Sequence, residues 1–521
     1  MTNLLTAAQM RAIEQAAIDS GEVTGLELME RAGEGVVEAI LEEWPDMAKT
    51  PQKAVVLCGP GNNGGDGFVV ARLLKQRGWA VEVFLYGEVE KLPPDVKVNA
   101  KRWLELGEVK NSRYFDADID LVESGAHLKV DAILGTGLSR HLVGEIADFI
   151  DKLRCSGGAN VAIDGPSGFC ADSGKWLGEN NADLFYHNSS VLNVTFETPK
   201  IGHFLWPMTF ATGKVIVKEI GLEERLLLSG DIDFVNLTYF PYFPQSKHPD
   251  SHKFHHGHAL ILSGPSARTG AARLAARGAL RIGAGVVSLG CPQEAMAECA
   301  AQLTAIMLAP IEDGAALGAV LQDTRISALC LGPALGVDDR GRGLVEVALG
   351  GVEPHPTVLD ADALTIFAGE PELFAALHEN CVLTPHAGEF KRLFPDIMAK
   401  LEAPATTGPA YSKVDATREA AARAGCVVLF KGADTVIASP DGRAAINSAH
   451  YERAAPWLAT AGSGDVLAGF ITGLLARGFA PMHAAETAAW LHVECALKFG
   501  PGLIAEDIPE QLPAVFRALD L

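Results

Sequence analysis

The chain has 521 residues, 48% of them hydrophobic and 21% charged, and 54 are glycine. Because a single hydrophobic core stops growing well below this length, we expect two domains of the α/β type. The formal net charge is −22, and Lys and Arg form no cluster. This argues against a nucleic-acid partner, since phosphate backbones are held by gathered positive charge.

The nine cysteines lie mostly within apolar runs and include no C-x-x-C pair. This usage is typical of buried thiols in a reducing compartment, so we expect a cytoplasmic protein. The first residues, Met1 to Thr6, lack the basic and apolar regions of a signal peptide. No apolar run is long enough to span a bilayer, so we expect no membrane partner.

Two helices are predicted near the N-terminus. Thr6 precedes Gln9 by three residues and Thr24 precedes Glu27 by three, the spacing of a capping box. In the second helix, apolar residues recur at helical spacing and predict one buried stripe. This stripe consists of Met29, Ala32, Val36, Val37 and Ile40.

From residue 54 onward, short β-rich runs alternate with longer helical runs, which predicts parallel strands joined by helical crossovers. Three prolines between Tyr239 and Asp250 interrupt this pattern. We therefore predict a first domain at 1–225, a linker at 226–250 and a second domain at 251–521. The predicted strands are 54–58, 80–86, 130–134, 160–163, 191–196 and 214–220, then 258–262, 286–289, 328–331, 357–359, 382–383 and 427–430.

The sequence GPGNNGGDG, residues 59–67, joins a predicted strand to a predicted helix. Glycines let a ligand approach the main chain, and the start of a helix offers free N–H groups to a phosphate. The loop lacks the Lys-Ser/Thr pair of a Walker A motif. A phosphate site and a tight connection therefore both stay open.

Two further strand ends bring polar residues to the same edge of the sheet. Residues 130–134 lead into GTGLSRH at 135–141, and residues 161–163 lead into DGPSG at 164–168. Asp131 and Asp164 are candidates for acid–base chemistry or for binding a cation. A single aspartate at such a position often only caps a loop.

Together with PKIGH at 199–203, these segments resemble the NAD(P)H-hydrate epimerase family over most of residues 1–225. The resemblance implies a Rossmann-like three-layer domain in which Asp164 does acid–base work and Asn63, Asp131 and Ser167 hold K⁺. We expect Gly64 and Gly65 to leave room for the dinucleotide. The residues implied to bind the hydrated dinucleotide are Asn62, Asn63, Gly64, Gly65, Asp66, Gly135, Thr136, Gly137, Leu138, Ser139, Arg140, His141 and Asp164. Gly165 and Asn193 depart from the family pattern.

In the second half, AGSGDVLAG at 461–469 precedes a helical pattern. Main-chain N–H groups at a helix start can stabilise a phosphoryl group during transfer, and Asp465 can take the proton from an attacking hydroxyl. The arrangement resembles the anion hole of ribokinase-like enzymes. A plain glycine helix cap is the simpler alternative.

Seven segments precede this loop in a fixed order: GHALILSG at 257–264, TGAA at 269–272, ALRIGAG at 279–285, LGPALG at 331–336, LDADAL at 359–364, LTPHAGE at 383–389 and FKGADT at 430–435. The series resembles the ADP-dependent NAD(P)H-hydrate dehydratase from about residue 250 onward. This implies a ribokinase-like α/β domain that uses Mg²⁺ and ADP, with Asp465 as the catalytic base. The residues implied to contact the hydrated dinucleotide are Ala271, Gly336, His386 and Asp465, and those implied to bind ADP or AMP are Lys431, Gly432, Ala433, Asp434, Thr435 and Gly464. Thr304 and Ala334 depart from the family pattern.

Two further groups of polar residues call for an interpretation. The histidines near the boundary lack Cys or carboxylate partners at ligand spacing, so we favour a polar linker over a metal site. As alternate residues at a strand end, Asp360 and Asp362 are expected to point to opposite faces, so at most one would reach a Mg-nucleotide. The histidines are His248, His252, His255, His256 and His258.

The two resemblances together imply a bifunctional repair enzyme, which we expect to be a homo-oligomer. One domain would interconvert the R and S forms of hydrated NADH and NADPH. The other would dehydrate the S form with ADP, giving AMP and phosphate. Two alternatives stay open: a small-alcohol kinase acting on a vitamin precursor, and a non-catalytic N-terminal module for nucleotide binding or assembly.

Overall fold

The computed structural model describes residues 2–116, 125–155, 159–178, 191–223, 225, 234–238, 247, 250–351 and 353–520. The chain forms two compact units. The first comprises Asn3–Val235 and Ala403–Ser412, and the second comprises Asn236–Glu402, Lys413–Leu521 and Met1–Thr2. This division differs from the predicted ranges, because a short segment far along the chain belongs to the first unit. No helix among the described residues is long and apolar enough to cross a membrane.

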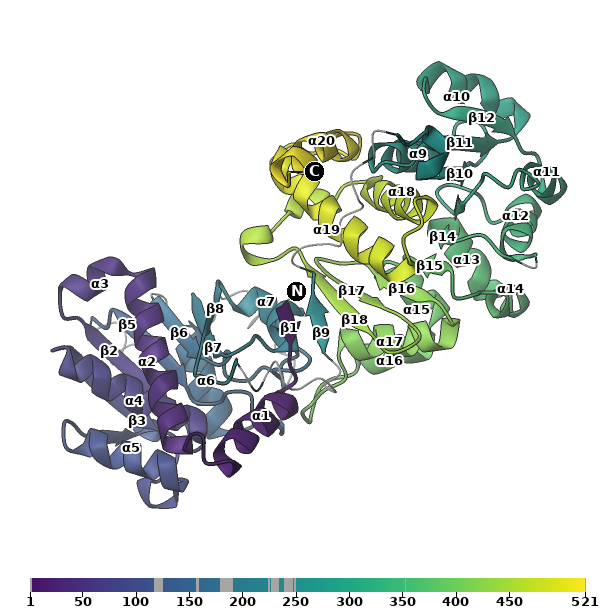
Figure 1. The fold of residues 1–521 in the computed structure, drawn as a ribbon. Helices are drawn as coiled ribbons and strands as arrows, with labels where there is room; N and C mark the ends of the chain where they lie inside the picture. Colours follow the sequence, from purple (N-terminus) through teal and green to yellow (C-terminus); the bar gives the residue numbers. More distant parts are fainter. Residues whose placement is uncertain are drawn as a thin grey trace. The chain divides into compact units, whose positions relative to one another are not determined.

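The first unit is built on a seven-stranded sheet (Figure 1). Its strands are β2 (Lys53–Cys58), β3 (Ala80–Leu85), β4 (Val109–Asn111), β5 (Leu128–Ala132), β6 (Ala159–Ile163), β7 (Leu192–Phe196) and β8 (Val215–Lys218). They lie in the order β4-β3-β2-β5-β6-β7-β8, and all pairs are parallel. In β2, Val56 and Cys58 join the core on one face of the sheet, while Val55 and Leu57 join the core on the other face. A strand that is apolar on both faces is typical of the centre of a parallel sheet.

Helices cover both faces of this sheet. They are α1 (Ala7–Asp19), α2 (Gly25–Glu43), α3 (Pro45–Lys49), α4 (Asn62–Gln76), α5 (Pro94–Leu104), α6 (Glu145–Cys155) and α7 (Met208–Ala211). The two predicted capping boxes, Thr6 with Gln9 and Thr24 with Glu27, are confirmed at the starts of α1 and α2. The predicted apolar stripe of α2 is buried in the core.

The strand order reverses direction between β2 and β5, since β3 and β4 lie on one side and β6 to β8 on the other. In sheets of this kind, ligands bind beyond the carboxyl ends of the strands at such a reversal. The loop at 59–67 follows β2 and the loop at 135–141 follows β5. Both predicted substrate loops therefore flank the reversal point.

The second unit contains a sheet whose strands are β10 (His258–Leu262), β11 (Val286–Cys291), β12 (Met307–Pro310), β13 (Ala328–Leu331), β14 (Thr357–Leu359), β15 (Cys381–Leu383), β16 (Val427–Phe430), β17 (Asp434–Ala438) and β18 (Ala444–Ser448). With the short strands β1 (Thr2–Leu4) and β9 (Val235–Leu237), the order is β1-β9-β18-β17-β16-β15-β14-β13-β10-β11-β12. The pairs from β16 to β12 are parallel, whereas β17 pairs antiparallel with β16 and β18. Here the order reverses between β10 and β13. The linker predicted at 226–250 lies mostly outside the described residues, and β9 occupies part of it.

Helices also pack on both faces of this second sheet. They are α9 (Gly270–Arg281), α10 (Met296–Gln302), α11 (Gly314–Val320), α12 (Asp339–Leu349), α13 (Ala361–Gly369), α14 (Pro371–Ala375), α15 (Ala387–Leu393), α16 (Pro395–Glu402), α17 (Lys413–Ala424), α18 (Ser463–Ala476), α19 (Pro481–Phe499) and α20 (Asp507–Ala518). Helices α9 and α18 approach closely at Gly469. A Cβ added there would lie 2.1 Å from the Ala275 carbonyl oxygen. The predicted fold class, a Rossmann-like three-layer domain followed by a ribokinase-like α/β domain, is confirmed.

Candidate active sites

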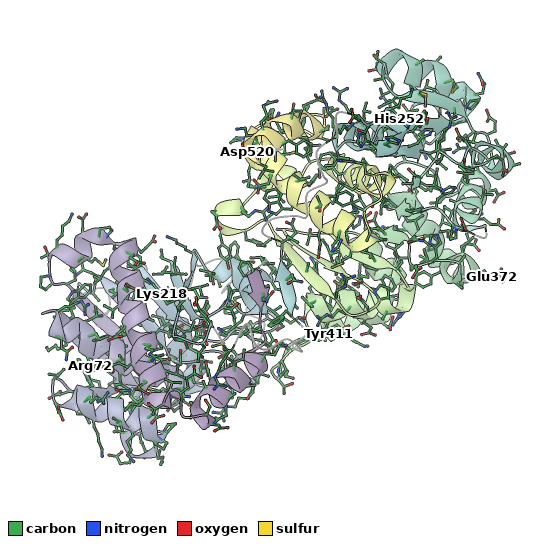
Figure 2. All side chains as sticks on the ribbon, viewed as in Figure 1. Arg72, Lys218, His252, Glu372, Tyr411 and Asp520 are labelled. Carbon is green, nitrogen blue, oxygen red and sulfur yellow. The ribbon has the colours of Figure 1, made fainter. Side chains whose placement is uncertain are left out.

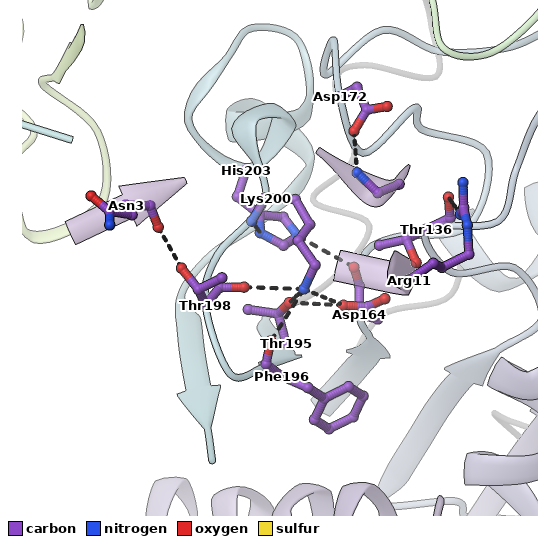
Figure 3. A network of polar contacts seen from close by, with 11 residues as sticks. Asn3, Arg11, Thr136, Asp164, Asp172, Thr195, Phe196, Thr198, Lys200 and His203 are labelled. Atoms are coloured by element: carbon purple, nitrogen blue, oxygen red, sulfur yellow. Dashed lines mark hydrogen bonds and ion pairs between the residues drawn. The ribbon is translucent and has the colours of Figure 1, made fainter. Parts of the chain in front are cut away.

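Asp164 follows β6 and is the centre of a polar network in the first unit (Figure 3). Its Oδ1 accepts hydrogen bonds from Thr195 Oγ1 at 2.8 Å and from Lys200 Nζ at 3.2 Å. Its backbone φ is 61°, a left-handed conformation that a non-glycine residue adopts only when its surroundings enforce it. Gly165 follows with φ 148°, so the departure at this position places glycine where the backbone favours it.

Lys200 is a functional candidate that the sequence motif contained but that we assigned no role. Its side chain is 1% exposed, and besides Asp164 its Nζ donates to Thr195 Oγ1 and to the carbonyl oxygens of Phe196 and Thr198. Burial alone would raise the pKa of Asp164, but the charge of Lys200 and the hydrogen bond from Thr195 outweigh it and hold that pKa below its usual value. Asp164 is therefore an ionised carboxylate at neutral pH.

His203 contacts both Lys200 and Asp164 through its two ring nitrogens. Burial and the charge of Lys200 lower the pKa of His203 to about 4, so the ring is neutral at pH 7. Its Nδ1 accepts from the Lys200 backbone N–H at 3.0 Å, and its Nε2 lies 3.3 Å from the Asp164 carbonyl oxygen. These two contacts assign the hydrogen to Nε2, which donates to that oxygen.

Two other carboxyl groups lie near Asp164. Burial raises the pKa of Asp66 well above its usual value, with further contributions from the charges of Asp164 and Glu14. Burial and the charge of Asp164 raise the pKa of Glu14 to about 7, against the opposing charges of Lys200 and Arg11. Asp66 belongs to the predicted substrate set, whereas sequence reasoning missed Glu14.

The structure brings together two of the three predicted K⁺ ligands. Ser167 Oγ donates to Asp131 Oδ1 at 2.5 Å, and the Ser167 backbone N–H donates to Asp131 Oδ2 at 2.9 Å. Asn63 lies against the next loop, where its Oδ1 would be 3.0 Å from a Cβ on Gly135. Its Nδ2 is buried and has no hydrogen-bond partner among the described residues. Carboxylate, hydroxyl and amide oxygens are hard donors and fit an alkali cation.

Gly64 and Gly65 of the 59–67 loop face protein atoms. A Cβ on Gly64 would lie 1.9 Å from the Gly59 carbonyl oxygen, and a Cβ on Gly65 would lie 2.4 Å from Met29 Sδ. Packing of α4 against its own loop and against α2 therefore requires glycine at both positions. This packing explains the two glycines without the role that we expected for them, which was to leave room for a ligand. The exposed Asn62 and the half-buried Asn63 form the start of α4, where N–H groups point out of the helix.

The predicted substrate loop at 135–141 is held by the segment Ala403–Ser412. Arg140 forms an antiparallel bridge with Thr407, and the Gly408 N–H donates to the Ser139 carbonyl oxygen at 3.0 Å. On the other side, Arg11 Nη1 donates to the Thr136 carbonyl oxygen at 3.3 Å, and the Thr136 side chain bonds to Asp164. The loop is thus tied to α1, to Asp164 and to a distant part of the chain.

In the second unit, Asp465 lies in the first turn of α18, behind Gly462 with φ 89°. Burial raises the pKa of Asp465 to about 7, the charge of Asp360 adds to the shift, and Lys431 opposes it. His492 holds the same helix start, since its Nε2 lies 2.9 Å from the Ser463 carbonyl oxygen. Asp465 is therefore poised to exchange a proton near neutral pH beside the free N–H groups of α18.

Lys431 is the main positive charge beside Asp465. Its Nζ lies 2.7 Å from Asp360 Oδ1 and 3.8 Å from Glu389 Oε2, and a Cβ on Gly464 would lie 3.5 Å from it. Burial alone would lower the pKa of Lys431, but Asp360 and Glu389 outweigh it and raise that pKa. The predicted residues Lys431, Gly464 and Asp465 therefore form one cluster, to which Asp360 and Glu389 belong as well.

The remaining predicted nucleotide residues turn from β16 into β17. Thr435 Oγ1 donates to the Gly432 carbonyl oxygen at 2.7 Å, which closes the turn. Asp434 is paired with Lys413, whose Nζ lies 2.7 Å from Asp434 Oδ1 and 4.5 Å from the centroid of the Phe430 ring. Sequence reasoning missed Lys413, because the pairing joins α17 to a strand that follows it.

The expectation that Asp360 and Asp362 alternate along a strand is wrong, as the position of Asp362 shows. Asp362 lies within α13, whereas Asp360 is the residue that precedes this helix, so the two do not alternate along a strand. They nevertheless have different partners: Asp360 pairs with Lys431, and Asp362 Oδ2 accepts from the Gly336 N–H at 2.9 Å. Ala334, in the same turn as Gly336, has φ 52°, a left-handed conformation that favours glycine.

The other predicted residues of this unit lie at helix starts or on the surface. His386 precedes α15, and its Nδ1 accepts from the Gly388 N–H at 2.9 Å while its side chain stays 55% exposed. Ala271 lies in the first turn of α9, behind Thr269. Thr304 is exposed just before β12 and does not belong to the cluster around Lys431.

The described histidines near the predicted domain boundary contact nearby side chains. His252 (labelled in Figure 2) stacks on His255 with ring centroids 3.6 Å apart, and His256 Nε2 lies 2.8 Å from Ser251 Oγ. His258 is buried in β10, where its Nε2 lies 2.8 Å from Ser288 Oγ, so it is part of the sheet rather than of a linker. His248 lies outside the described residues. Within the described parts of the chain, no group of three or more His, Cys, Asp and Glu is arranged to hold a metal ion.

Two α/β units, each with carboxylates and helix N–H groups beyond the carboxyl ends of its parallel strands, are typical of an enzyme with two nucleotide-type sites. Residues 25–202 match the family described as YjeF-related protein N-terminus, and residues 259–509 match the family described as NAD(P)H-hydrate dehydratase. The chain belongs to the bifunctional NAD(P)H-hydrate repair enzymes, in which an epimerase domain is joined to a dehydratase domain. This confirms the resemblance found in the sequence and favours it over the small-alcohol kinase alternative.

Individual relatives and a solved structure are similar to all or part of this chain. The bifunctional NAD(P)H-hydrate repair enzyme Nnr of Moorella thermoacetica is 34% identical over 99% of this chain and 97% of its own. The NAD(P)H-hydrate epimerase of Rhodobacter capsulatus is 47% identical over 43% of this chain and 100% of its own. A solved ADP/ATP-dependent NAD(P)H-hydrate dehydratase from Bacillus subtilis, co-crystallised with ATP/Mg²⁺, is 26% identical, covers 52% of this chain and 93% of its own, and has a TM-score of 0.41.

Proposed function

We propose that Asp164 is the residue of the first unit that exchanges protons with the hydrated nicotinamide ring as its R and S forms interconvert. The observation that carries this is the ionised carboxylate of Asp164, fixed by Lys200 and Thr195 at the carboxyl end of β6. The N–H groups at the start of α4 and the 135–141 loop would bind the hydrated NADH or NADPH. Asn63, Asp131 and Ser167 would hold K⁺, which would balance the negative charge of the dinucleotide phosphates beside them.

In the second unit, we propose that Asp465 takes the proton from the hydroxyl of the S form. That oxygen then attacks the β-phosphorus of ADP, an O–P bond forms, and AMP leaves. The C–O bond then breaks and phosphate leaves. The ring loses a proton from the neighbouring carbon, which restores NAD(P)H. The raised pKa of Asp465 at the start of α18 supports the role of a base near neutral pH.

The nucleotide would lie against the turn at 431–435 and the N–H groups of Gly464 and its neighbours. Lys431, whose Nζ lies close to Gly464, would place its positive charge beside the phosphates. Mg²⁺ would accompany ADP and neutralise charge on the transferred group. Ala271, Gly336 and His386 would contact the hydrated dinucleotide.

The test is a mixture of hydrated NADH epimers, with recovery of NADH absorbance followed with and without ADP. We expect full recovery with ADP and none without it. No recovery with ADP would contradict the dehydratase, and recovery that stops at one epimer would contradict the epimerase. D465N should abolish dehydration and leave epimer exchange, and D164N should do the reverse, whereas loss of both activities in either variant would mean one shared site.

We also propose that the protein acts in the cytoplasm as a homo-oligomer. The cysteines whose side chains the structure describes are free and buried, which suits a reducing compartment. Sedimentation of the purified protein would test the oligomeric state.

A further inference from the structure

Lys413 is the first residue of α17, a helix that packs against β16 and β17 (Figure 1). Its side chain is 13% exposed, so the ammonium group is largely shielded from solvent. Its Nζ lies 2.7 Å from Asp434 Oδ1 and 4.5 Å from the centroid of the Phe430 ring. A positive charge therefore lies against the turn at 431–435, which contains most of the predicted nucleotide residues.

Lys413 Nζ donates hydrogen bonds to three oxygen atoms of this turn. The acceptors are the Lys431 carbonyl oxygen at 3.4 Å, the Asp434 carbonyl oxygen at 2.9 Å and Asp434 Oδ1 at 2.7 Å. An ammonium group has three hydrogens to donate, so one lysine side chain can satisfy all three acceptors. A Cβ on Gly432 would lie 2.7 Å from the same Nζ, which shows how closely the backbone of the turn passes the ammonium group.

The other carbonyl oxygens of the turn also have donors within the protein. The Gly432 carbonyl oxygen accepts from Thr435 Oγ1, and the Ala433 carbonyl oxygen accepts from the Ala449 N–H, both at 2.7 Å. All four carbonyl oxygens at 431–434 are thus hydrogen-bonded to the chain, two of them by the ammonium group. A turn binds an anion through N–H groups and positive charge, so its oxygens must be directed elsewhere.

The carboxylate of Asp434 is a second obstacle to an anionic ligand at this turn. A carboxylate repels a nearby phosphate, and salt screens this repulsion only weakly at a partly buried site. Lys413 offsets the charge, because its Nζ lies 2.7 Å from that carboxylate. Lys431 belongs to the same turn, but its Nζ lies 2.7 Å from Asp360 instead.

We propose that Lys413 is a positioning residue for ADP in the second unit. It holds the oxygens of the 431–434 turn away from the phosphates and offsets the charge of Asp434. This inference rests on the proposed dehydratase function, in which the same turn binds ADP. Because Lys413 acts through the turn, it controls the affinity for ADP, whereas the chemical step depends on Asp465.

The first experiment measures the binding of ADP, AMP and adenosine to the wild type and to K413M by calorimetry. Mg²⁺ is chelated, so that the Asp434 carboxylate cannot recruit this ion when the lysine is absent. In K413M we expect the Kd for ADP to rise about tenfold, because a charged hydrogen-bond donor is lost and a repulsion is added. The rise should be smaller for AMP, which has fewer charges, and the Kd for uncharged adenosine should stay within about twofold. Retained adenosine binding shows that the site is folded.

A second variant separates the effect of charge from an effect on folding. K413M/D434N removes the carboxylate together with the ammonium group, and it should bring the Kd for ADP back to within about threefold of the wild type. In dehydration, K413M should raise the KM for ADP, while kcat and the KM for the S form stay within about twofold. The matched control is K391M in α15. Lys391 is 59% exposed and pairs with Glu402, so its loss should change none of these constants.

The possible outcomes separate this inference from the proposed function. If the wild type does not bind ADP, the proposed function of the turn fails. If the wild type binds ADP and K413M binds it with the same Kd, the role of Lys413 is refuted. Equal losses of adenosine and ADP binding in K413M, without recovery in K413M/D434N, would mean that Lys413 only maintains the fold of the turn, which would also overturn the proposal.

Discussion

Lys200 Nζ lies 3.2 Å from Asp164 Oδ1, and the lysine side chain is 1% exposed. Removal of one partner from a buried ion pair leaves the other charge without compensation, which costs about 3–5 kcal/mol. We therefore expect K200M to destabilise the first unit by that amount and to raise the pKa of Asp164. Urea unfolding, with hydrogen exchange to assign the transition to this unit, measures the effect.

The control for this variant is K214M. Lys214 is 51% exposed and pairs with Glu43, so its loss should cost no more than about 1 kcal/mol. The lowered pKa of Asp164 stabilises the fold above the usual pKa near 3.8, and this contribution disappears as the pH falls below that value. K200M should lack this acid-dependent loss, and equal effects of K200M and K214M would contradict the argument.

The central strands could be predicted from the sequence because they are apolar on both faces. The predictions at 258–262, 328–331, 357–359 and 427–430 coincide with β10, β13, β14 and β16. The hairpin of β17 and β18 was missed, since we expected strands to alternate with helices throughout. The turn between them, with Pro440, Asp441 and Gly442, carried a hairpin signal that was available in the sequence.

The parts of the sites that could be predicted were those at strand ends, where one motif brings its residues together. Asp131 with Ser167 and Lys431 with Gly464 are of this kind. Glu14 and Lys413 could not be found in this way, because each meets its partners only after the chain has folded. The segment Ala403–Ser412 is a similar case, since nothing in its composition marks it as part of the first unit.

Dehydration should depend on pH through Asp465. Its pKa is about 7, and a base must be deprotonated, so kcat/KM for dehydration should rise with pH through this value. Lys431 opposes the raised pKa, so in K431M the rise should move to higher pH even though the rate falls. A pH series with the S form and ADP measures this. K400M, which removes a surface pair with Glu419, should leave the profile in place, and an unchanged profile in K431M would contradict the coupling.

Ala334 occupies a left-handed conformation with φ 52°, which costs a non-glycine residue about 1–2 kcal/mol. Glycine loses about 0.5–1 kcal/mol more backbone entropy on folding, so A334G should stabilise the second unit by a net gain of about 0.5–1 kcal/mol. The same substitution at Ala319, in the helix α11, should destabilise by a similar amount. Thermal unfolding of the two variants should therefore move in opposite directions, and a destabilised A334G would show that φ does not control stability at this turn.

The segment Ala403–Ser412 should affect the epimerase through the loop that it holds. A Cβ on Gly408 would lie 2.6 Å from the Leu138 carbonyl oxygen, so G408A must displace this loop or lose the hydrogen bond to Ser139. Loss of one such hydrogen bond corresponds to about 1 kcal/mol, or roughly a fivefold rise in KM for the hydrated dinucleotide in epimerisation. Dehydration should stay within twofold of wild type.

The matched variant is T406A, at an exposed position of the same segment, which should keep both activities. Initial rates of epimer exchange at several substrate concentrations separate KM from kcat. Equal KM values for G408A and wild type would mean that the contact of Gly408 with Ser139 does not position the substrate loop. A parallel fall of both activities in G408A would instead point to general loss of folding, which the unfolding curve of the variant would reveal.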